Sequence, residues 1–139
     1  SDNKEITKKN LKIVTKKKPS QTQTEDLIFA FKVARYVKSN AIVFVKNKTT
    51  LGIGAGQMSR IDSTKIAKEK AKNFKINLKG SVMASEAFFP FRDNVDLAYK
   101  IGVTSIIQPG GSLKDKAIID VADKHNISMV FSGTRVFKH

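Results

Sequence analysis

Hydrophobic and polar positions alternate along the chain in blocks that predict helices and strands in turn. The first block, from Thr24 to about Asn40, is apolar almost all round and predicts a buried helix. Short continuous apolar runs then predict buried strands, and segments with one apolar face predict the helices between them. The predicted strands cover residues 41–45, 50–55, 80–85, 103–108 and 127–132, and the later helices cover 59–74, 94–102 and 113–126.

This order of elements predicts an α/β fold. Strands that alternate with helices of this length lie parallel to their neighbours, with helices on both faces of the sheet. One pair, 41–45 and 50–55, is separated by only a short polar turn and is expected to form a hairpin. We therefore expect a three-layer α/β/α arrangement with a mixed, mostly parallel sheet. Ligands of such folds bind at the carboxyl ends of the strands.

The first 20 residues do not fit this pattern. They hold seven lysines, two acids and one short apolar cluster around Ile13, which cannot bury a face of its own. Residues 1–20 are expected to form an extended basic arm with room for one edge strand. A chain of 139 residues is long enough for one core, so residues 21–139 are expected to form the single packed unit.

Charge narrows the range of partners. Twenty-six basic and twelve acidic side chains give a formal net charge of +14, which favours a phosphate-bearing or polyanionic partner. Only four of the basic residues are arginines, whereas nucleic-acid surfaces usually rely on arginine. Scattered lysines are also typical of an ordinary solvated surface. A basic nucleic-acid-binding α/β module therefore stays open as the alternative, although nucleic acid is not the partner we favour.

Several kinds of chemistry are disfavoured by the composition. The chain has no cysteine, which excludes disulfides and thiolate ligands, and its two histidines are too few for a histidine-rich metal site. No metal is therefore expected. The chain has no apolar run of membrane-spanning length, and its polar first residues do not resemble a signal peptide. A cytoplasmic protein with no membrane partner is expected.

The segment LGIGAGQMSR (51–60) carries the most distinctive local pattern. Its glycines at 52, 54 and 56 match neither a dinucleotide fingerprint, because Gln57 breaks the spacing, nor a P-loop. Two interpretations stay open: the glycines allow close packing against another element, or they let a flat ligand approach the backbone. In the second case Arg60, at the start of the next helix, would face the ligand.

Other candidate residues lie near the predicted strand and helix ends. Asn40 is either a left-handed cap of the first helix or a group that holds an amide-bearing substrate. Phe88, in AFFPFRD, is either a core residue or an aromatic platform for a flat ring. Asp93 could be only a helix cap, and PGGS (109–112) could be only a turn. His125 is expected to be an exposed histidine at a helix end.

Six blocks of the chain resemble one known family, in the same order and at the same spacing. They are VTKKKPS (14–20), VKSNAIV (37–43), LGIGAGQMSRIDS (51–63), GSVMASEAFFPFRDNVD (80–96), IQPGGS (107–112) and RVFKH (135–139). The family is the bifunctional purine biosynthesis proteins, which join AICAR transformylase to IMP cyclohydrolase. The resemblance covers about residues 11–139 and is to the C-terminal part, within the transformylase domain.

The resemblance implies a formyltransferase of IMP biosynthesis. In that family the formyl group of the co-substrate 10-formyltetrahydrofolate passes to the amino group of the ribonucleotide AICAR. The family's fold implies a cytidine-deaminase-like unit without zinc, and the full-length protein is expected to be a homodimer. By matching positions, AICAR would contact Asn40, Arg60, Phe88 and Arg135, and the folate would contact Ile61, Asp93, Ser112 and Leu113.

The sequence departs from the family in one respect that matters for catalysis. The family uses a lysine–histidine pair in a motif that lies upstream in the transformylase domain, and DKHN (123–126) is not that motif. The first deaminase-like unit and the cyclohydrolase domain have no counterpart in these residues either. We therefore expect a C-terminal fragment that carries part of the substrate site and does not catalyse alone.

Overall fold

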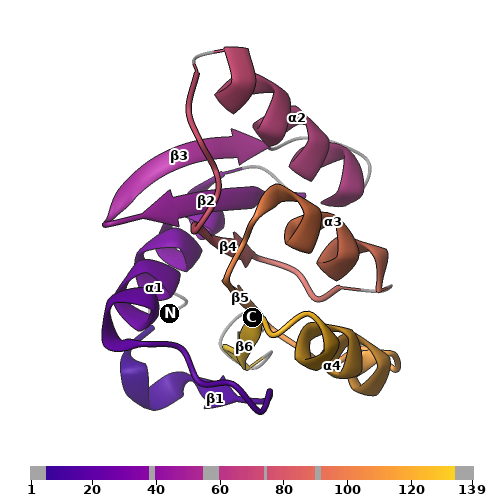
Figure 1. Ribbon diagram of the computed structural model, residues 1–139. Helices are drawn as coiled ribbons and strands as arrows, with labels where there is room; N and C mark the ends of the chain where they lie inside the picture. Colours follow the sequence, from indigo (N-terminus) through magenta and orange to yellow (C-terminus); the bar gives the residue numbers. More distant parts are fainter. Residues whose placement is uncertain (1–5, 38–39, 55–59, 74, 90–91, 134–139) are drawn as a thin grey trace.

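The computed structural model describes residues 6–37, 40–54, 60–73, 75–89 and 92–133, and these form a mixed six-stranded sheet with four α-helices (Figure 1). No helix within these ranges is long and apolar enough to cross a membrane. The strands are β1 (Lys12–Ile13), β2 (Ile42–Lys46), β3 (Thr49–Gly54), β4 (Val82–Ser85), β5 (Ser105–Gln108) and β6 (Ser128–Phe131). The helices are α1 (Gln21–Tyr36), α2 (Arg60–Asn73), α3 (Asp93–Ile101) and α4 (Asp115–Lys124), and a short 3-10 turn, η1, covers Lys8–Asn10.

The strands are ordered β1-β6-β5-β4-β2-β3 across the sheet. β4, β5 and β6 pair parallel, whereas β2 is antiparallel to both of its neighbours and β1 is antiparallel to β6. The expected α/β class and mixed, mostly parallel sheet are confirmed, since β3, β4, β5 and β6 run in the same direction, although β2 runs against both of its neighbours. The crossover through α2 joins two strands of the same direction, β3 and β4, and leaves the antiparallel β2 between them.

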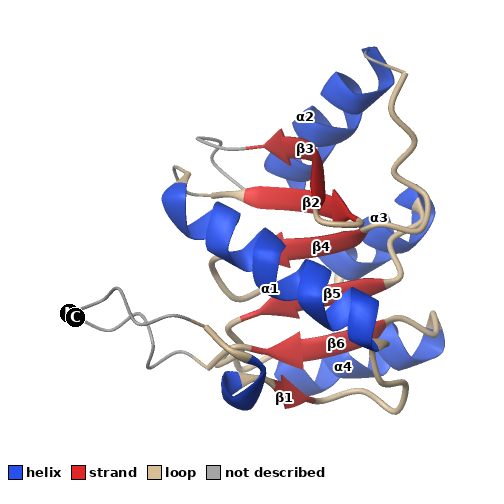
Figure 2. Cartoon of the chain, turned by 90° about the vertical axis from the view of Figure 1, so that its left-hand side faces the viewer, coloured by secondary structure: helices blue, strands red, loops and turns tan. Residues whose placement is uncertain are grey.

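The helices cover the two faces of the sheet unequally, as Figure 2 shows with α1 in front of the sheet and the other three behind it. Alternate residues of each strand supply the two cores. Val43 and Ala84 pack in the α1 layer, and Phe44 and Met83 pack against α2, α3 and α4. This arrangement is the predicted three-layer α/β/α fold.

The start of α1 differs from the sequence prediction. The helix begins at Gln21, because Ser20 and Gln23 form a reciprocal capping box with hydrogen bonds of 3.0 and 2.8 Å. Asp26, on α1, is buried and accepts hydrogen bonds from the backbone N–H groups of Asn47 and Lys48 at 2.9 and 2.8 Å. Its carboxylate therefore ties α1 to the turn of the β2–β3 hairpin.

The first described residues lie against the sheet. Ile6 is buried in the α1 layer, and the hydroxyl of Thr15 accepts a hydrogen bond from Met129 of β6 at 2.8 Å. The backbone N–H of Lys16 donates to Asp123 of α4, also at 2.8 Å. These contacts continue the short pairing of β1 with β6.

His125 corrects one prediction, because it is not solvated. Its side chain is only 17% exposed, and its Nε2 lies 2.8 Å from Oδ1 of Asp96 on α3. The imidazole also stacks on Tyr99, with ring centroids 4.0 Å apart. Hydrogen bonding to His125, supported by Arg92, lowers the pKa of Asp96 despite its partial burial. This cluster links α3 to the end of α4.

The Asp96→Asn substitution is expected to destabilise the fold in a pH-dependent way. Because the pKa of Asp96 is lowered from its ordinary 3.8 in the folded chain, its charge stabilises the fold above about pH 4, and this contribution is lost as the pH falls through the folded-state pKa. Urea unfolding of the unsubstituted protein and the Asp96→Asn variant, between about pH 6 and pH 2, measures the difference in their free energies of unfolding.

The matched control is Asp120→Asn, since the ion pair of Asp120 with Lys116 is largely exposed. It should change the free energy of unfolding little at any pH in this range. A loss for Asp96→Asn that is equal at both ends of the range would contradict the assignment.

Candidate functional site

The candidate residues follow strand ends that meet at one edge of the sheet. Ile42, the first residue of β2, pairs with Gly54 at the end of β3 and with Ser85 at the end of β4. Gln108 and Phe131, the last residues of β5 and β6, pair with each other. We call this edge the site edge. The loops after β3, β4, β5 and β6 therefore start side by side, as in other folds with ligands at the carboxyl ends of strands.

Asn40 is attached to the start of α2. Its main-chain oxygen accepts a hydrogen bond from the hydroxyl of Ser63, which is fully buried on α2. The side chain of Asn40 is half-buried and has interactions of its own. α1 ends at Tyr36 and its C-cap residue is Val37, so the interpretation of Asn40 as the helix cap is wrong.

The structure shows whether the glycines of β3 serve close packing or the approach of a ligand, at Gly52 and Gly54. A Cβ at Gly54 would overlap the main-chain oxygen of Ser63, and one at Gly52 would lie 3.2 Å from the main-chain oxygen of Ala67. Both glycines therefore allow close packing of α2 on the strand, and they do not leave a bare surface for a ligand. Gly56 lies outside the described residues.

The first turn of α2 reaches the site edge through this contact. Arg60 is its first residue, and Ile61, the second, is half-buried. The side chain of Arg60 is outside the described part of the structure, as is the whole of Arg135. The structure therefore brings Asn40 and Ile61 to the same corner of the site edge as the backbone of Arg60.

The loop after β4 divides its phenylalanines between the core and the surface. Phe89 is fully buried, whereas Phe88 is 41% exposed. The hydroxyl of Ser85 donates to the main-chain oxygen of Ala87 at 2.7 Å and so bends the chain directly after the strand. Asp93 is exposed in the first turn of α3, where the N-cap position belongs to Arg92. Phe88 is therefore available to a ligand, and Asp93 is not the cap residue.

Gln108 joins the loops after β4 and β5, and the sequence analysis did not single it out. It is fully buried, and its Oε1 accepts hydrogen bonds from the backbone N–H groups of Phe89 and Gly110, both at 3.1 Å. Its Nε2 lies 3.6 Å from the sulfur of Met129. The available signal was a polar residue at the end of the apolar run VTSIIQ, directly before a proline and two glycines.

The PGGS segment is held in place by Asp115 at the start of α4. The Asp115 carboxylate accepts hydrogen bonds from the backbone N–H groups of Gly111 and Ser112 at 2.8 and 3.1 Å. The Ser112 hydroxyl accepts from the backbone N–H of Lys114 at 3.0 Å. Leu113, between them, is fully exposed. The segment is a turn, as one interpretation predicted, and it presents Leu113 to solvent.

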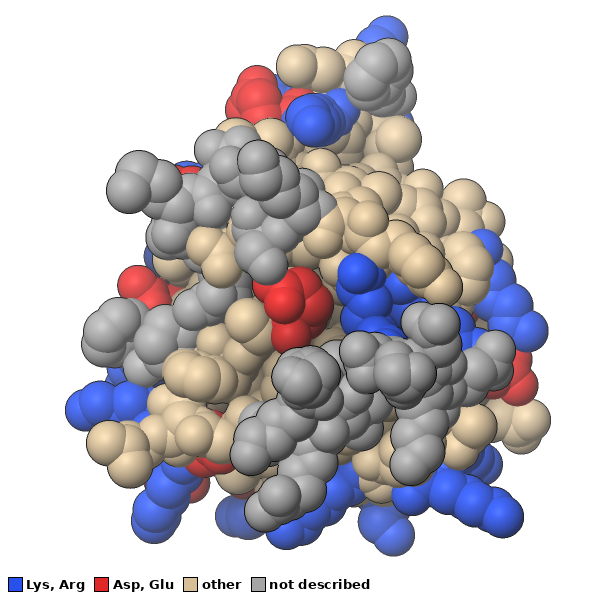
Figure 3. Space-filling model, turned by 180° about the vertical axis from the view of Figure 1, so that it is seen from behind, with Lys and Arg blue, Asp and Glu red and all other residues tan. Residues whose placement is uncertain are grey.

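The site edge thus gathers the described candidates from three loops. Asn40 and Ile61 lie at its β2–β3 end, Phe88 and Asp93 flank the connection from β4 to α3, and Ser112 and Leu113 follow β5, as the sheet order requires. Figure 3 looks onto this edge and shows visible lysine and arginine side chains scattered mainly around its outline. In the described part of the chain, no group of three or more His, Asp or Glu side chains could hold a metal ion.

Comparison with known proteins decides the family. The sequence model described as AICARFT/IMPCHase bienzyme matches residues 1–70. The chain belongs to this family. Relatives named bifunctional purine biosynthesis protein PurH extend the similarity over the rest of the sequence.

Two of these PurH proteins show the extent of the match. The one from Wigglesworthia glossinidia brevipalpis is 56% identical over 139 residues, which are 100% of this chain and 26% of that protein. The one from Chlorobaculum parvum is 54% identical over 138 residues, which are 99% of this chain and 26% of that protein. The chain therefore spans about a quarter of the length of these PurH relatives.

Solved structures of deaminases resemble the fold. A dCMP deaminase from the cyanophage S-TIM5 has a TM-score of 0.53 at 14% identity, over 81% of this chain and 98% of that one. A diaminohydroxyphosphoribosylaminopyrimidine deaminase/5-amino-6-(5-phosphoribosylamino)uracil reductase from Thermotoga maritima has a TM-score of 0.52 at 17% identity, over 78% of this chain and 35% of that one. The expected deaminase-like fold of this PurH-family chain is thereby confirmed.

Replacing Gly54 with alanine should destabilise the protein by about 3 kcal/mol, because the new methyl group would overlap the α2 main chain and force the helix off the strand. The Gly52→Ala protein is the matched control and should lose only about 1 kcal/mol, since its methyl group meets a contact that is merely tight. Urea unfolding measures both. Equal losses would mean that the β3–α2 contact does not set the helix position.

Replacing Gln108 with leucine should cost about 2 to 4 kcal/mol, because two buried backbone N–H groups would lose their acceptor. The amide resonances of the loops after β4 and β5 should shift together in an NMR spectrum. The exposed Gln21→Leu substitution is the control and should change stability by less than about 0.5 kcal/mol. A stable Gln108→Leu protein with unchanged loop resonances would show that Gln108 does not join the loops.

Proposed function

We propose that this chain forms part of the AICAR formyltransferase of IMP biosynthesis, which transfers the formyl group of 10-formyltetrahydrofolate to AICAR. The supporting observation is topological: the described residues among those assigned to AICAR and folate from the matching sequence blocks lie at one edge of the sheet, although they come from different segments. Membership of the PurH family is consistent with this reaction. The full-length protein would be cytoplasmic and would also carry the IMP cyclohydrolase activity.

AICAR would bind at the end of the site edge formed by β2, β3 and β4. The carboxamide side chain of Asn40 offers a donor and an acceptor for the substrate carboxamide. The exposed ring of Phe88 offers an aromatic face for the imidazole. Arg60 and Arg135 supply guanidinium groups, at least one of them for the phosphate, which arginine binds through paired hydrogen bonds.

The folate would bind alongside, in contact with Ile61, Asp93, Ser112 and Leu113. Leu113 offers an exposed apolar side chain, and Ser112 belongs to a turn whose backbone is fixed by Asp115. A fixed turn holds a co-substrate at a defined distance from the attacking amine, which lowers the entropic cost of the bimolecular step.

The chain would not catalyse the reaction alone. An arylamine is a weak nucleophile, so the transfer needs a base to take its proton and a donor to stabilise the tetrahedral oxyanion. The lysine–histidine pair of the family would supply these from an upstream segment. His125 is unsuited to the role, since its Nε2 is already paired with Asp96 away from the site edge.

Formyl transfer, followed by absorbance, tests the proposal directly. It should be detected for the chain extended upstream in its own gene and not for the 139-residue chain. Activity of the short chain would contradict the upstream base. A lack of activity in both proteins, with both folded, would overturn the formyltransferase proposal.

The alternative, a nucleic-acid-binding module, makes a different prediction. Its affinity for an oligonucleotide would fall steeply with salt and would not respond to AICAR. The +14 charge favours it, whereas the scatter of lysines around the site edge does not. Salt-dependent oligonucleotide binding by a protein that ignores AICAR would favour the alternative.

Two substitutions at exposed positions separate the proposed substrate sites. In the extended protein, Phe88→Ala should raise the KM for AICAR by about tenfold, because the imidazole loses its aromatic contact. Leu113→Ala should instead raise the KM for 10-formyltetrahydrofolate, and each variant serves as the control of the other. Steady-state kinetics with each substrate varied in turn measures both. If both variants changed the same KM, the assignment of the two sites would be wrong.

A further inference from the structure

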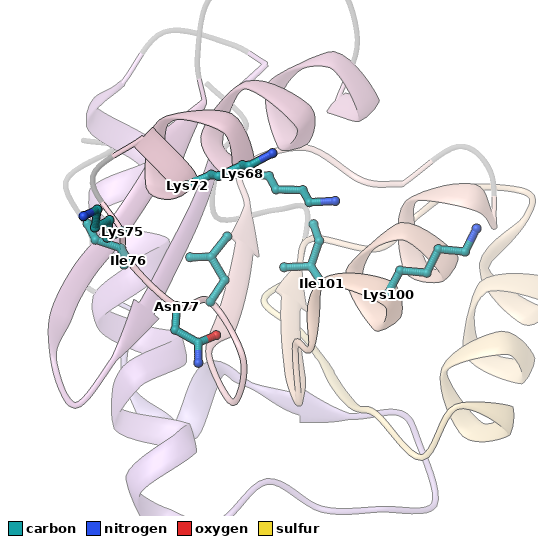
Figure 4. Close-up of a pocket in the computed structure, with 8 residues that line it drawn as sticks. Lys68, Lys72, Lys75, Ile76, Asn77, Lys100 and Ile101 are labelled. Carbon is teal, nitrogen blue, oxygen red and sulfur yellow. The ribbon is translucent and has the colours of Figure 1, made fainter.

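A pocket lies at the C-terminal end of α2, away from the site edge. It is open to solvent, has a volume of about 380 Å³ and is lined by the ends of α2 and α3 and by the segment that leads into β4 (Figure 4). We call it the lysine pocket, because four of its lining residues are Lys68, Lys72, Lys75 and Lys100. Nothing in the proposed formyl transfer uses it.

The lysine pocket combines positive charge with an apolar wall. None of its described lining residues is acidic, and Ile76, Leu78 and Ile101 supply aliphatic surface between the lysines. Ile76 is 37% exposed, so part of its side chain is accessible to a ligand. The combination suits an anion that also carries an apolar group.

The helix ends do not account for these lysines. At the end of α2, the backbone N–H groups of Lys75 and Ile76 donate to Lys72 and Ala71 at 3.0 and 2.7 Å. At the end of α3, the backbone N–H of Gly102 caps the last turn. These backbone hydrogen bonds cap the last turns of both helices without the lysine side chains. Within the described structure, the ammonium groups of the four lysines have neither an ion pair nor a hydrogen bond.

The lysines also repel one another. Lys68 and Lys72 are four residues apart on one face of α2, a spacing at which like charges destabilise a helix. Figure 4 shows both side chains extending across the gap toward Ile101, with Lys75 and Lys100 on opposite sides of the pocket. Glu69 lies on α2 but does not line the pocket. A bound anion would relieve this repulsion.

We propose that the lysine pocket binds a small phosphate monoester with an apolar substituent. Lys68 and Lys72 hold the phosphate, and the aliphatic wall of Ile76, Leu78 and Ile101 contacts the substituent. Lys75 and Lys100, on opposite sides of the pocket, add to its positive potential. The site is independent of the proposed formyltransferase function, because it lies at the other end of α2.

Phenyl phosphate is a suitable probe, since it joins a dianion to a flat apolar ring. Titration of the isotope-labelled 139-residue chain should give saturable NMR shifts in the methyl groups of Ile76, Leu78 and Ile101 and in the amides of Lys68 and Lys72. Benzyl alcohol, which has the ring without the charge, should give none. Shifts that spread over the whole surface without saturation would overturn the proposal.

The double variant Lys68→Gln/Lys72→Gln should weaken phenyl phosphate binding by about tenfold or more, because two charged donors are lost. The control Lys17→Gln/Lys18→Gln removes the same charge from exposed positions near the start of the chain and should leave the affinity unchanged. Urea unfolding verifies that both variants are folded. Equal weakening in both double variants would mean that net charge alone causes the binding, and this would overturn the proposal. Binding of a tetra-aspartate peptide in place of phenyl phosphate would also overturn it, because the pocket would then be a site for an acidic protein segment.

Discussion

The arrangement depends on one close contact, between β3 and the first turns of α2. Because Gly54 has no side chain, the main chain of α2 lies directly against the strand, and Ser63 reaches the main-chain oxygen of Asn40. A larger residue would separate helix from sheet and remove that hydrogen bond. The same contact fixes the direction of α2, so that Arg60 starts at the site edge and Lys72 lies at the opposite end. Both candidate sites are therefore positioned by a single steric constraint.

A buried amide performs the corresponding task among the loops. Gln108 is fully buried and cannot bond to water, so its side-chain oxygen needs a hydrogen-bond donor inside the protein. The backbone N–H groups of Phe89 and Gly110, from two different loops, are these donors. This fixes the backbone directly after Phe88, although that side chain is itself exposed. An exposed aromatic ring on a fixed backbone can meet a ligand without first being ordered, which reduces the entropic cost of binding.

The helices and strands from residue 21 onward could be predicted because periodicity reports burial, and burial determines where regular elements form. The antiparallel hairpin of β2 with β3 was predicted, but the antiparallel pairing of β2 with β4 was not, since the crossover through α2 is a property of the whole chain. The location of the candidate site could be proposed from the sequence for the same reason as the elements, because the ends of the strands can be read from it. The roles of Gln108, His125 and Asp26 were not, because each depends on a partner far away in the sequence. The β3 glycines fitted two interpretations until the position of α2 was known.

Positive charge serves different purposes at the two ends of α2. Arginine presents a planar fork that fixes the orientation of a phosphate, and Arg60 begins the helix at the site edge, where the proposed formyl transfer would demand orientation. Lysine presents a point charge on a flexible stem, and Lys68 and Lys72 flank a pocket where retention of an anion is sufficient. A net charge of +14 does not distinguish these cases, because it adds all cations alike. The choice between arginine and lysine at each end therefore separates a site that orients its ligand from one that only holds it.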